Sequence, residues 1–146
     1  YTALMNPHIP HSFYRVIVKA LILDETRTKF LIVQIANGKW DIPGGGLDWG
    51  ESPEEGLTRE IQEEMGLTLT SMHPNPCYFL TYLKSNGELH VANVLYEATL
   101  EHLNFTPSEE CVAFRFVTPD EARTLELLSN SRLLADMFDP KNHTNQ

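Results

Sequence analysis

Residues 43–67 read PGGGLDWGESPEEGLTREIQEEMGL, and they carry the strongest structural signals in the chain. Its second half predicts a helix over residues 53–65. Ser52 can cap that helix and Glu55 completes a capping box three residues later, while a proline suits the first helical position. Gly66 supplies a stop at the other end. Between the two ends, an apolar stripe recurs at helical spacing, at Leu57, Ile61 and Met65.

The predicted helix also carries an acidic arc. At about 100° per residue, Glu60, Glu63 and Glu64 share one side of the helix, beside the apolar stripe. Three carboxylates this close repel one another. A hard cation such as Mg²⁺ reverses that repulsion, because it prefers oxygen ligands and often shares its coordination shell with phosphates. From the helix alone, a solvated acidic face is the competing interpretation.

The spacing around the helix narrows this choice. Five residues separate Gly45 from Glu51, and seven more lead to the run Arg59-Glu60-Ile61-x-Glu63-Glu64-x-Gly66-Leu67. At every specified position this resembles the box of the Nudix hydrolase family, G-x5-E-x7-R-E-U-x-E-E-x-G-U with U aliphatic. The lead-in at residues 40–45, WDIPGG, and the stretch at 110–121 also look like that family. The resemblance implies an α/β fold, a Nudix-like α/β/α sandwich with a central mixed β-sheet, and a divalent-metal hydrolase.

The resemblance further implies a metal site within the box. Glu60 and Glu64 would bind the cation, together with the backbone carbonyl of Gly45. Glu63 would be a further ligand or the base that deprotonates water. The implied cofactor is Mg²⁺, with Mn²⁺ as an alternative.

Three more residues are candidates for the catalytic site. By the same resemblance, Arg59 and Glu51 would pair and hold the carboxylates in position; Glu51 could instead only stabilise the helix dipole. Glu110 lies where some family members supply a base or an additional ligand. A merely exposed loop glutamate is the alternative there.

Candidate substrate-binding residues lie in two predicted strands. Arg15 and Lys19 share one face of the first strand and could bind substrate phosphates, although charged residues also protect edge strands. Trp40 could stack on a base, or pack in the core beside the glycine run.

The remaining sequence predicts strands on both sides of the helix. Val, Ile, Leu and aromatic residues concentrate at 14–23, 30–35, 40–42, 77–84, 88–100 and 113–117. Asn37-Gly38 and Asn86-Gly87 are hairpin signals, so some strand pairs are antiparallel and the sheet is mixed. Further helical stretches are expected at 119–128 and 131–138. We expect a single domain over residues 1–146, with an N-terminal arm at 1–12 and a polar tail at 139–146.

Composition limits the possible partners. A net charge of −9 with only 11 Lys and Arg argues against binding of duplex nucleic acid, and a bound cation would be needed to attract a phosphorylated substrate. No apolar run is long enough to span a membrane. Cys77 and Cys111 are expected to be buried free thiols in a reducing compartment, which favours the cytoplasm. A homodimer is a reasonable expectation for a protein of this size.

The box indicates chemistry rather than substrate. We expect a pyrophosphohydrolase that directs water at a phosphorus of a nucleoside diphosphate-linked or nucleoside triphosphate substrate. Tyr82, about fifteen residues after the box, is associated in the family with diadenosine polyphosphates, and a nucleotide sugar is another candidate. The alternative from a different class is a Nudix-fold module that senses a nucleotide without cleaving it. Intact glutamates favour the enzyme.

Overall fold

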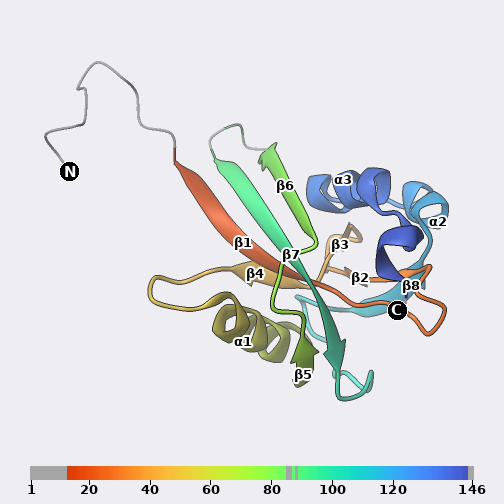
Figure 1. Ribbon diagram of the computed structural model, residues 1–146, viewed down its shortest axis with the longest axis horizontal. Helices are drawn as coiled ribbons and strands as arrows, with labels where there is room; N and C mark the ends of the chain where they lie inside the picture. Colours follow the sequence, from red (N-terminus) through yellow and green to blue (C-terminus); the bar gives the residue numbers. More distant parts are fainter. Residues whose placement is uncertain (1–12, 85–86, 88, 145–146) are drawn as a thin grey trace, which may run out of the picture.

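The computed structural model describes residues 13–84, 87 and 89–144; the predicted arm at 1–12 and the last two residues of the predicted tail lie outside them. Figure 1 shows the elements in their order along the chain. They are β1 Tyr14–Leu21, β2 Phe30–Gln34, β3 Trp40–Asp41, β4 Gly44–Gly46, α1 Pro53–Met65, β5 Leu69–Met72, β6 Tyr78–Leu83, β7 His90–Leu100, β8 Ala113–Val117, α2 Pro119–Arg123, α3 Ser129–Met137 and the short 3₁₀ helix η2 Pro140–His143.

Helix α1 begins and ends where the sequence predicts. The Ser52 side chain accepts a hydrogen bond from the Glu55 amide, and the Glu55 carboxylate accepts one from the Ser52 amide. Gly66 closes the helix in the left-handed conformation, at φ 64°. The apolar stripe is buried, as predicted. Local signals therefore fix this helix before any tertiary contact is considered.

The predicted mixed sheet is confirmed, and the described strands divide between two sheets. The larger sheet has the order β4-β1-β7-β5, with β6 also pairing with β7. Its β1–β7 pair is parallel, whereas β4, β5 and β6 pair with their neighbours antiparallel. The smaller sheet, β3-β2-β8, is antiparallel. Lys19 therefore lies where β1 is paired on both sides, so the edge-strand explanation does not apply to it, whereas Arg15 precedes the residues of β1 that pair with β4.

Helices cover the sheets from opposite sides, which confirms the α/β/α sandwich (Figure 1). Helix α1 packs on β4 and β1 over one apolar cluster, which includes Val18, Leu31, Leu57 and Ile61. Helix α3 packs on β6 and β3 over a second cluster, which includes Leu21, Phe30, Leu95 and Leu134. In the part of the chain that the structure describes, no helix combines the length and apolar character needed to cross a membrane.

Non-local contacts account for the differences from the predicted elements. The glycine run, expected to approach a ligand, also forms β4, because Gly44–Gly46 pairs with β1. Strand β5 was not predicted; it forms because Leu69, Ser71 and Met72 pair with β7. Helix α2 ends at Arg123, well short of residue 128. The segment that follows pairs with Trp40 instead, because the Trp40 amide donates to the Glu126 carbonyl and the Leu128 amide donates to the Trp40 carbonyl. Of the predicted hairpin signals, Asn37-Gly38 is confirmed between β2 and β3, and Asn86 lies outside the described residues.

Both cysteines carry free thiols, but they differ in burial. Cys111 is fully buried as expected, whereas Cys77 is half-buried. Burial raises the pKa of each thiol to about 11. Both groups are therefore protonated near neutrality and unsuited to act as nucleophiles.

The end of the described chain packs onto the fold and is not a free polar tail. His143 is buried, and its Nε2 lies 2.7 Å from the Tyr78 hydroxyl. Its Nδ1 lies 3.3 Å from a carboxylate oxygen of Glu97, and Arg27 donates hydrogen bonds to both the Glu97 carboxylate and the His143 carbonyl. The imidazole also stacks on Phe138 with an interplanar angle of 9°. These contacts fix η2 against β6 and β7.

We expect His143→Ala to lower the free energy of unfolding by about 1–3 kcal/mol, because it leaves buried polar partners without the imidazole. Urea denaturation followed by circular dichroism measures the change. Lys141→Ala is the matched control, since Lys141 is exposed in the same turn. Equal stability of the two variants would show that the histidine contributes nothing specific.

Candidate active site

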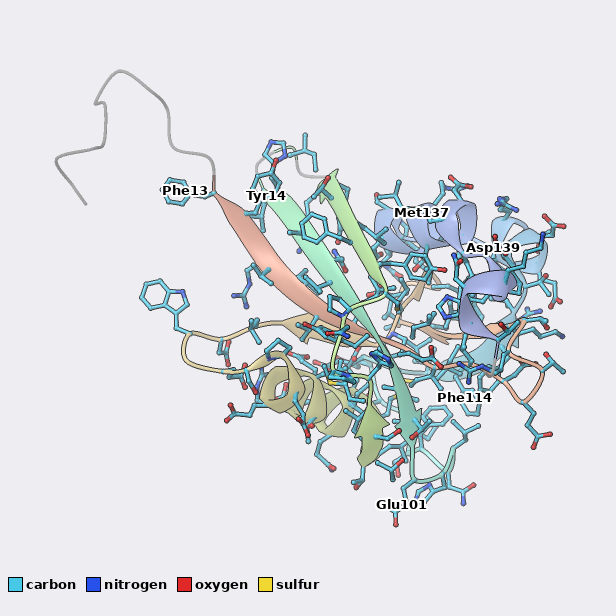
Figure 2. The ribbon with its side chains drawn as sticks, in the orientation of Figure 1. Phe13, Tyr14, Glu101, Phe114, Met137 and Asp139 are labelled. Carbon is cyan, nitrogen blue, oxygen red and sulfur yellow. The ribbon has the colours of Figure 1, made fainter. Side chains whose placement is uncertain are left out.

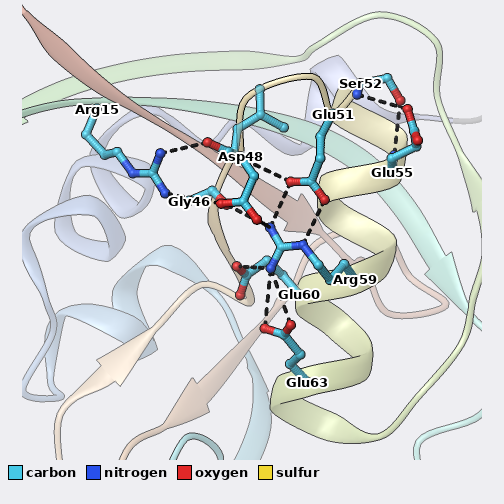
Figure 3. A network of polar contacts seen from close by, with 10 residues as sticks. Arg15, Gly46, Asp48, Glu51, Ser52, Glu55, Arg59, Glu60 and Glu63 are labelled. Atoms are coloured by element: carbon cyan, nitrogen blue, oxygen red, sulfur yellow. Dashed lines mark hydrogen bonds and ion pairs between the residues drawn. The ribbon is translucent and has the colours of Figure 1, made fainter.

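Arg59 lies at the centre of a network of polar contacts between α1 and the loop that precedes it (Figure 3). Its Nε and Nη2 each donate a hydrogen bond of 2.8 Å to the two carboxylate oxygens of Glu51. Its Nη2 also donates to the carbonyl of Gly46 at 3.0 Å. These hydrogen bonds lower the pKa of Glu51 to about 2. The predicted Arg59–Glu51 pair is present, and it attaches α1 to the loop after the glycine strand.

The same guanidinium also contacts two glutamates of the acidic arc. Nη1 lies 2.9 Å from a carboxylate oxygen of Glu60 and 3.3 Å from one of Glu63. The Glu63 side chain is 55% exposed, whereas that of Glu60 is only 17% exposed. Arg59 therefore offsets part of the repulsion within the arc, and it leaves Glu63 accessible to water.

A pocket rich in carboxylates lies beside this network. The acidic pocket, as we call it, is open and has a volume of about 520 Å³; it is lined by Ile35, Ala36, Asn37, Glu60, Glu64, Glu109 and Glu110. Its lining has four carboxylates and no lysine or arginine. The candidate Glu110 is thus brought to Glu60 and Glu64 from the loop before β8. Neighbouring Glu109 reaches the same pocket.

Glycine lets strand β4 approach these carboxylates closely. The amide of Gly44 donates a hydrogen bond of 2.7 Å to Glu64. Gly44 has a φ of +133°, which disfavours any residue with a side chain. A Cβ on Gly45 would lie 2.3 Å from the carboxyl carbon of Glu60. The backbone of Gly45 is therefore next to Glu60, as its predicted role as a carbonyl ligand requires.

Glu64 is held in an environment that disfavours its charge. Burial raises its pKa to about 8; the charges of Asp41 and Glu60 add to this effect, and Lys19 and the Gly44 amide oppose it. Within the described residues, no three acidic, imidazole or thiol groups already converge as a ligand shell. The donor set nevertheless fits a hard divalent cation, because it consists of carboxylates beside a backbone strand and a cation would relieve the unfavourable charge on Glu64.

A second, more enclosed pocket lies on the α3 side of β1. The Lys19 pocket, as we call it, has a volume of about 270 Å³ and is lined by Ile17, Lys19, Lys39, Asp41, Tyr82, Lys84, Leu127, Leu128, Ser129 and Asn130. Three lysines face one carboxylate in this lining. Its charge is therefore opposite to that of the acidic pocket, and it suits an anionic ligand.

The structure separates the three candidate substrate-binding residues. Lys19 lines the Lys19 pocket but is buried, and its ammonium is occupied by Asp41 and two backbone carbonyls. Arg15, on the same face of β1, is exposed and donates to the Leu47 carbonyl at 2.7 Å, so the two cations do not form one phosphate clamp. Trp40 lines neither named pocket and packs against the core cluster under α3, in line with the core alternative.

Two polar residues of the Lys19 pocket escaped the sequence analysis as candidates. Asp41 belongs to the lead-in of the box, and Asn130 is a polar residue at a core-facing position of α3, being 2% exposed. Asn130 donates to Asp41 at 2.6 Å. An asparagine among apolar positions of a helix is the one signal that could have identified this pair.

The NUDIX domain model matches residues 13–137, and the chain therefore belongs to the Nudix hydrolase family. The nucleoside triphosphatase NudI of Enterobacter sp. (strain 638) is 31% identical over 103 residues, which are 66% of this chain and 73% of that protein. The RNA pyrophosphohydrolase of Vibrio cholerae is 40% identical over 55 residues, but these cover only 38% of this chain and 32% of that protein.

Solved structures agree with the fold. The MutT protein from Methanosarcina mazei Go1 has a TM-score of 0.72 at 26% identity, covering 90% of this chain and 96% of that one. The MutT Nudix hydrolase from Burkholderia pseudomallei also has a TM-score of 0.72, at 21% identity over 88% of this chain and 100% of that one. The predicted fold class is confirmed.

The raised pKa of Glu64 predicts a pH dependence of stability. Folding raises this pKa from 4.5 to about 8, so metal-free protein holds the proton more tightly when folded. The resulting stabilisation is complete below the unfolded value and is lost as the pH rises through the folded one. In EDTA, the melting temperature of the parent should therefore fall between about pH 5 and about pH 8 and change little above that range.

Glu64→Gln should remove most of that slope, because an amide does not ionise and still accepts the Gly44 hydrogen bond. Glu54→Gln is the matched control, since Glu54 is exposed on the same helix, and it should keep the slope of the parent. Identical slopes in the two variants would contradict the environment described for Glu64.

Proposed function

We propose that this protein is a Mg²⁺-dependent pyrophosphohydrolase, with Mn²⁺ as a substitute, that cleaves a nucleoside triphosphate or a nucleoside diphosphate-linked substrate. One observation carries the proposal. Glu60 and Glu64 of α1 meet Glu110 in one pocket, beside a glycine strand whose backbone approaches both helix carboxylates. In this proposal Glu60, Glu64 and the Gly45 carbonyl hold the cation, and Glu63 is available as a further ligand.

A bound divalent cation would lower the pKa of a water molecule and neutralise the phosphate oxygens. The residues of this chain supply position and proton transfer. Arg59 keeps Glu60 and Glu63 in place while Glu51 anchors the guanidinium, and the 17% and 29% exposure of the Glu60 and Arg59 side chains limits their freedom. Glu64 must lose its proton before it can bind the cation. Because its pKa is about 8, the affinity for the cation should increase as the pH rises toward 8.

Two carboxylates are placed to accept the proton of the attacking water. Glu110 shares the acidic pocket with Glu60 and Glu64. Glu63 is more exposed and contacts Arg59. In either case the carboxylate takes the proton from water while the new bond to phosphorus forms and the phosphoanhydride bond breaks.

The Lys19 pocket supports a nucleotide as the substrate. It is linked to the acidic pocket through Gly44 of β4, which bonds to both Lys19 and Glu64, and it offers amide, carboxylate and phenol groups together with lysines. In our proposal the nucleoside occupies this pocket and the phosphates extend toward the acidic pocket. The similarity to a nucleoside triphosphatase supports a triphosphate; diadenosine polyphosphates and nucleotide sugars are the alternatives.

A nucleotide-sensing module without turnover is the second candidate function. The observation that favours it is that Arg59 forms ion pairs with Glu60 and Glu63, two of the candidate cation ligands. A sensor would bind nucleotide at the Lys19 pocket without releasing inorganic phosphate or pyrophosphate.

Turnover of a panel of nucleoside triphosphates, nucleotide sugars, dinucleoside polyphosphates and ADP-ribose distinguishes the two functions. We expect hydrolysis with Mg²⁺ that EDTA abolishes and added Mg²⁺ or Mn²⁺ restores. Whichever of Glu63→Gln and Glu110→Gln removes the base should lower kcat by about 10²- to 10⁴-fold. Nucleotide binding without any turnover would establish the sensor, and turnover that persists in EDTA would rule out the metal mechanism.

We propose further that the protein forms a homodimer, and that it acts in the cytoplasm. One face of the β1-β7-β6 region carries exposed apolar side chains, with Tyr14 50%, Phe79 63% and Leu83 46% exposed. Figure 2 shows Tyr14 where β1 extends beyond the helices. Two copies of the chain, each with a net charge of −9, could pack together through these apolar side chains without bringing charged groups into contact there.

Light scattering should give the mass of a dimer, and Phe79→Glu should give a monomer, because a carboxylate at the centre of the interface would be desolvated. Glu101→Gln, at an exposed site outside the face, is the control. A monomeric parent would exclude the dimer, and cell fractionation tests the location.

A further inference from the structure

A continuous chain of hydrogen bonds connects the wall of the Lys19 pocket to the acidic pocket. Asn130 donates to Asp41 at 2.6 Å, and Lys19 donates to the other oxygen of that carboxylate at 3.1 Å. Lys19 also donates to the Gly44 carbonyl at 3.2 Å, and the Gly44 amide donates to Glu64 at 2.7 Å. The chain passes through the glycine strand and ends on a carboxylate assigned to the cation.

Lys19 is the centre of this chain, and its surroundings leave it little freedom. The residue is 4% exposed, and the ammonium uses all three donors, the third on the Ile42 carbonyl at 2.8 Å. Burial alone would lower the pKa of this ammonium, but the nearby Asp41 and Glu64 carboxyls raise it above its usual value. The ammonium group of Lys19 therefore connects Asp41, at the end of β3, to Gly44, at the start of β4.

A purely structural ion pair is the simplest alternative. It accounts for the Lys19–Asp41 contact, but an apolar pair often replaces a buried ion pair without loss of stability. An ion pair does not account for the hydrogen bonds from Lys19 to the carbonyls of Ile42 and Gly44, which hold the Gly44 amide against Glu64. It also does not account for Asn130, which extends the network into the lining of the Lys19 pocket.

We propose that Lys19 is a positioning residue that couples the Lys19 pocket to the cation site, so that binding of a nucleoside in the pocket and binding of a divalent cation at Glu64 strengthen one another. Contact of a nucleoside with Asn130 or Asp41 favours one arrangement of the network, and Lys19 transmits that arrangement to Gly44 and so to Glu64. The inference rests on the proposed function for the location of both ligands. Thermodynamic linkage requires the effect to be reciprocal.

The test uses the full chain and ligands that cannot touch one another. Mn²⁺ affinity is measured by electron paramagnetic resonance, alone and with saturating adenosine, guanosine, cytidine or uridine in turn. Because an unphosphorylated nucleoside offers the metal no phosphate, any change in affinity must pass through the protein. The nucleoside affinity is then measured by calorimetry with and without Mn²⁺.

In the parent, we expect at least one nucleoside to tighten Mn²⁺ binding by about fivefold or more, and Mn²⁺ to tighten binding of that nucleoside by the same factor. Lys19→Met should remove this effect and weaken Mn²⁺ binding on its own by about ten- to a hundredfold. At nucleoside concentrations that saturate the variant, Asn130→Ala should remove the effect, and it should weaken Mn²⁺ binding on its own by less than Lys19→Met does, because Lys19 still holds Gly44.

Lys141→Met is the control, since Lys141 is exposed and lines neither pocket, and it should keep the coupling. If Lys19→Met does not fold, Lys19→Met/Asp41→Asn removes both buried charges together and takes its place. Coupling retained in either Lys19 variant, or independent binding of nucleoside and Mn²⁺ in the parent, would overturn the inference. Failure of the parent to bind Mn²⁺ at all would instead overturn the proposed function.

Discussion

The close contact between the carboxylates of α1 and the backbone of β4 is the constraint on which the rest of the structure depends. Glu60 lies against Gly45, and Glu64 accepts a hydrogen bond from Gly44. A side chain at Gly45 would displace the Glu60 carboxylate, so glycine is what allows that carboxylate to lie against the strand. The apolar stripe of α1 provides the driving force for that packing, because it is buried in the cluster shared with β1. Glu60 and Glu64 are thus partly buried because the apolar stripe beside them on α1 is buried.

Like charges brought together in this way require compensation, and the chain supplies it in two forms. Arg59 contacts Glu51, Glu60 and Glu63 on the exposed side of the arc. On the buried side, Lys19 interacts with Glu64, whose pKa is still raised to about 8. The compensation is incomplete at Glu64, and a divalent cation would complete it. The same imbalance explains how a protein of net charge −9 could accept a phosphorylated substrate.

Strand β1 gives the molecule its functional organisation. Its neighbour β4 carries the glycine backbone at the acidic pocket, and its own Lys19 lines the pocket of opposite charge on the α3 side. The linings of the two pockets are therefore connected by hydrogen bonds, because Lys19 of one and Glu64 of the other both bond to Gly44. A ligand with a nucleoside at one end and phosphates at the other matches this division of charge.

The sequence by itself determined α1, from its cap at Ser52 to its stop at Gly66, together with the Arg59–Glu51 pair, the mixed sheet and the family. These depend on local signals, namely capping, periodicity and the spacing of the box, which are written over a few dozen consecutive residues. Only the packing of strands and helices shows that Glu110 lines one pocket with Glu64, that Lys19 is buried against Asp41, and that His143 hydrogen-bonds to Tyr78. Each of these arrangements brings together residues that are distant in the chain. Strand pairing and helix packing, which no local pattern specifies, determine which of them meet.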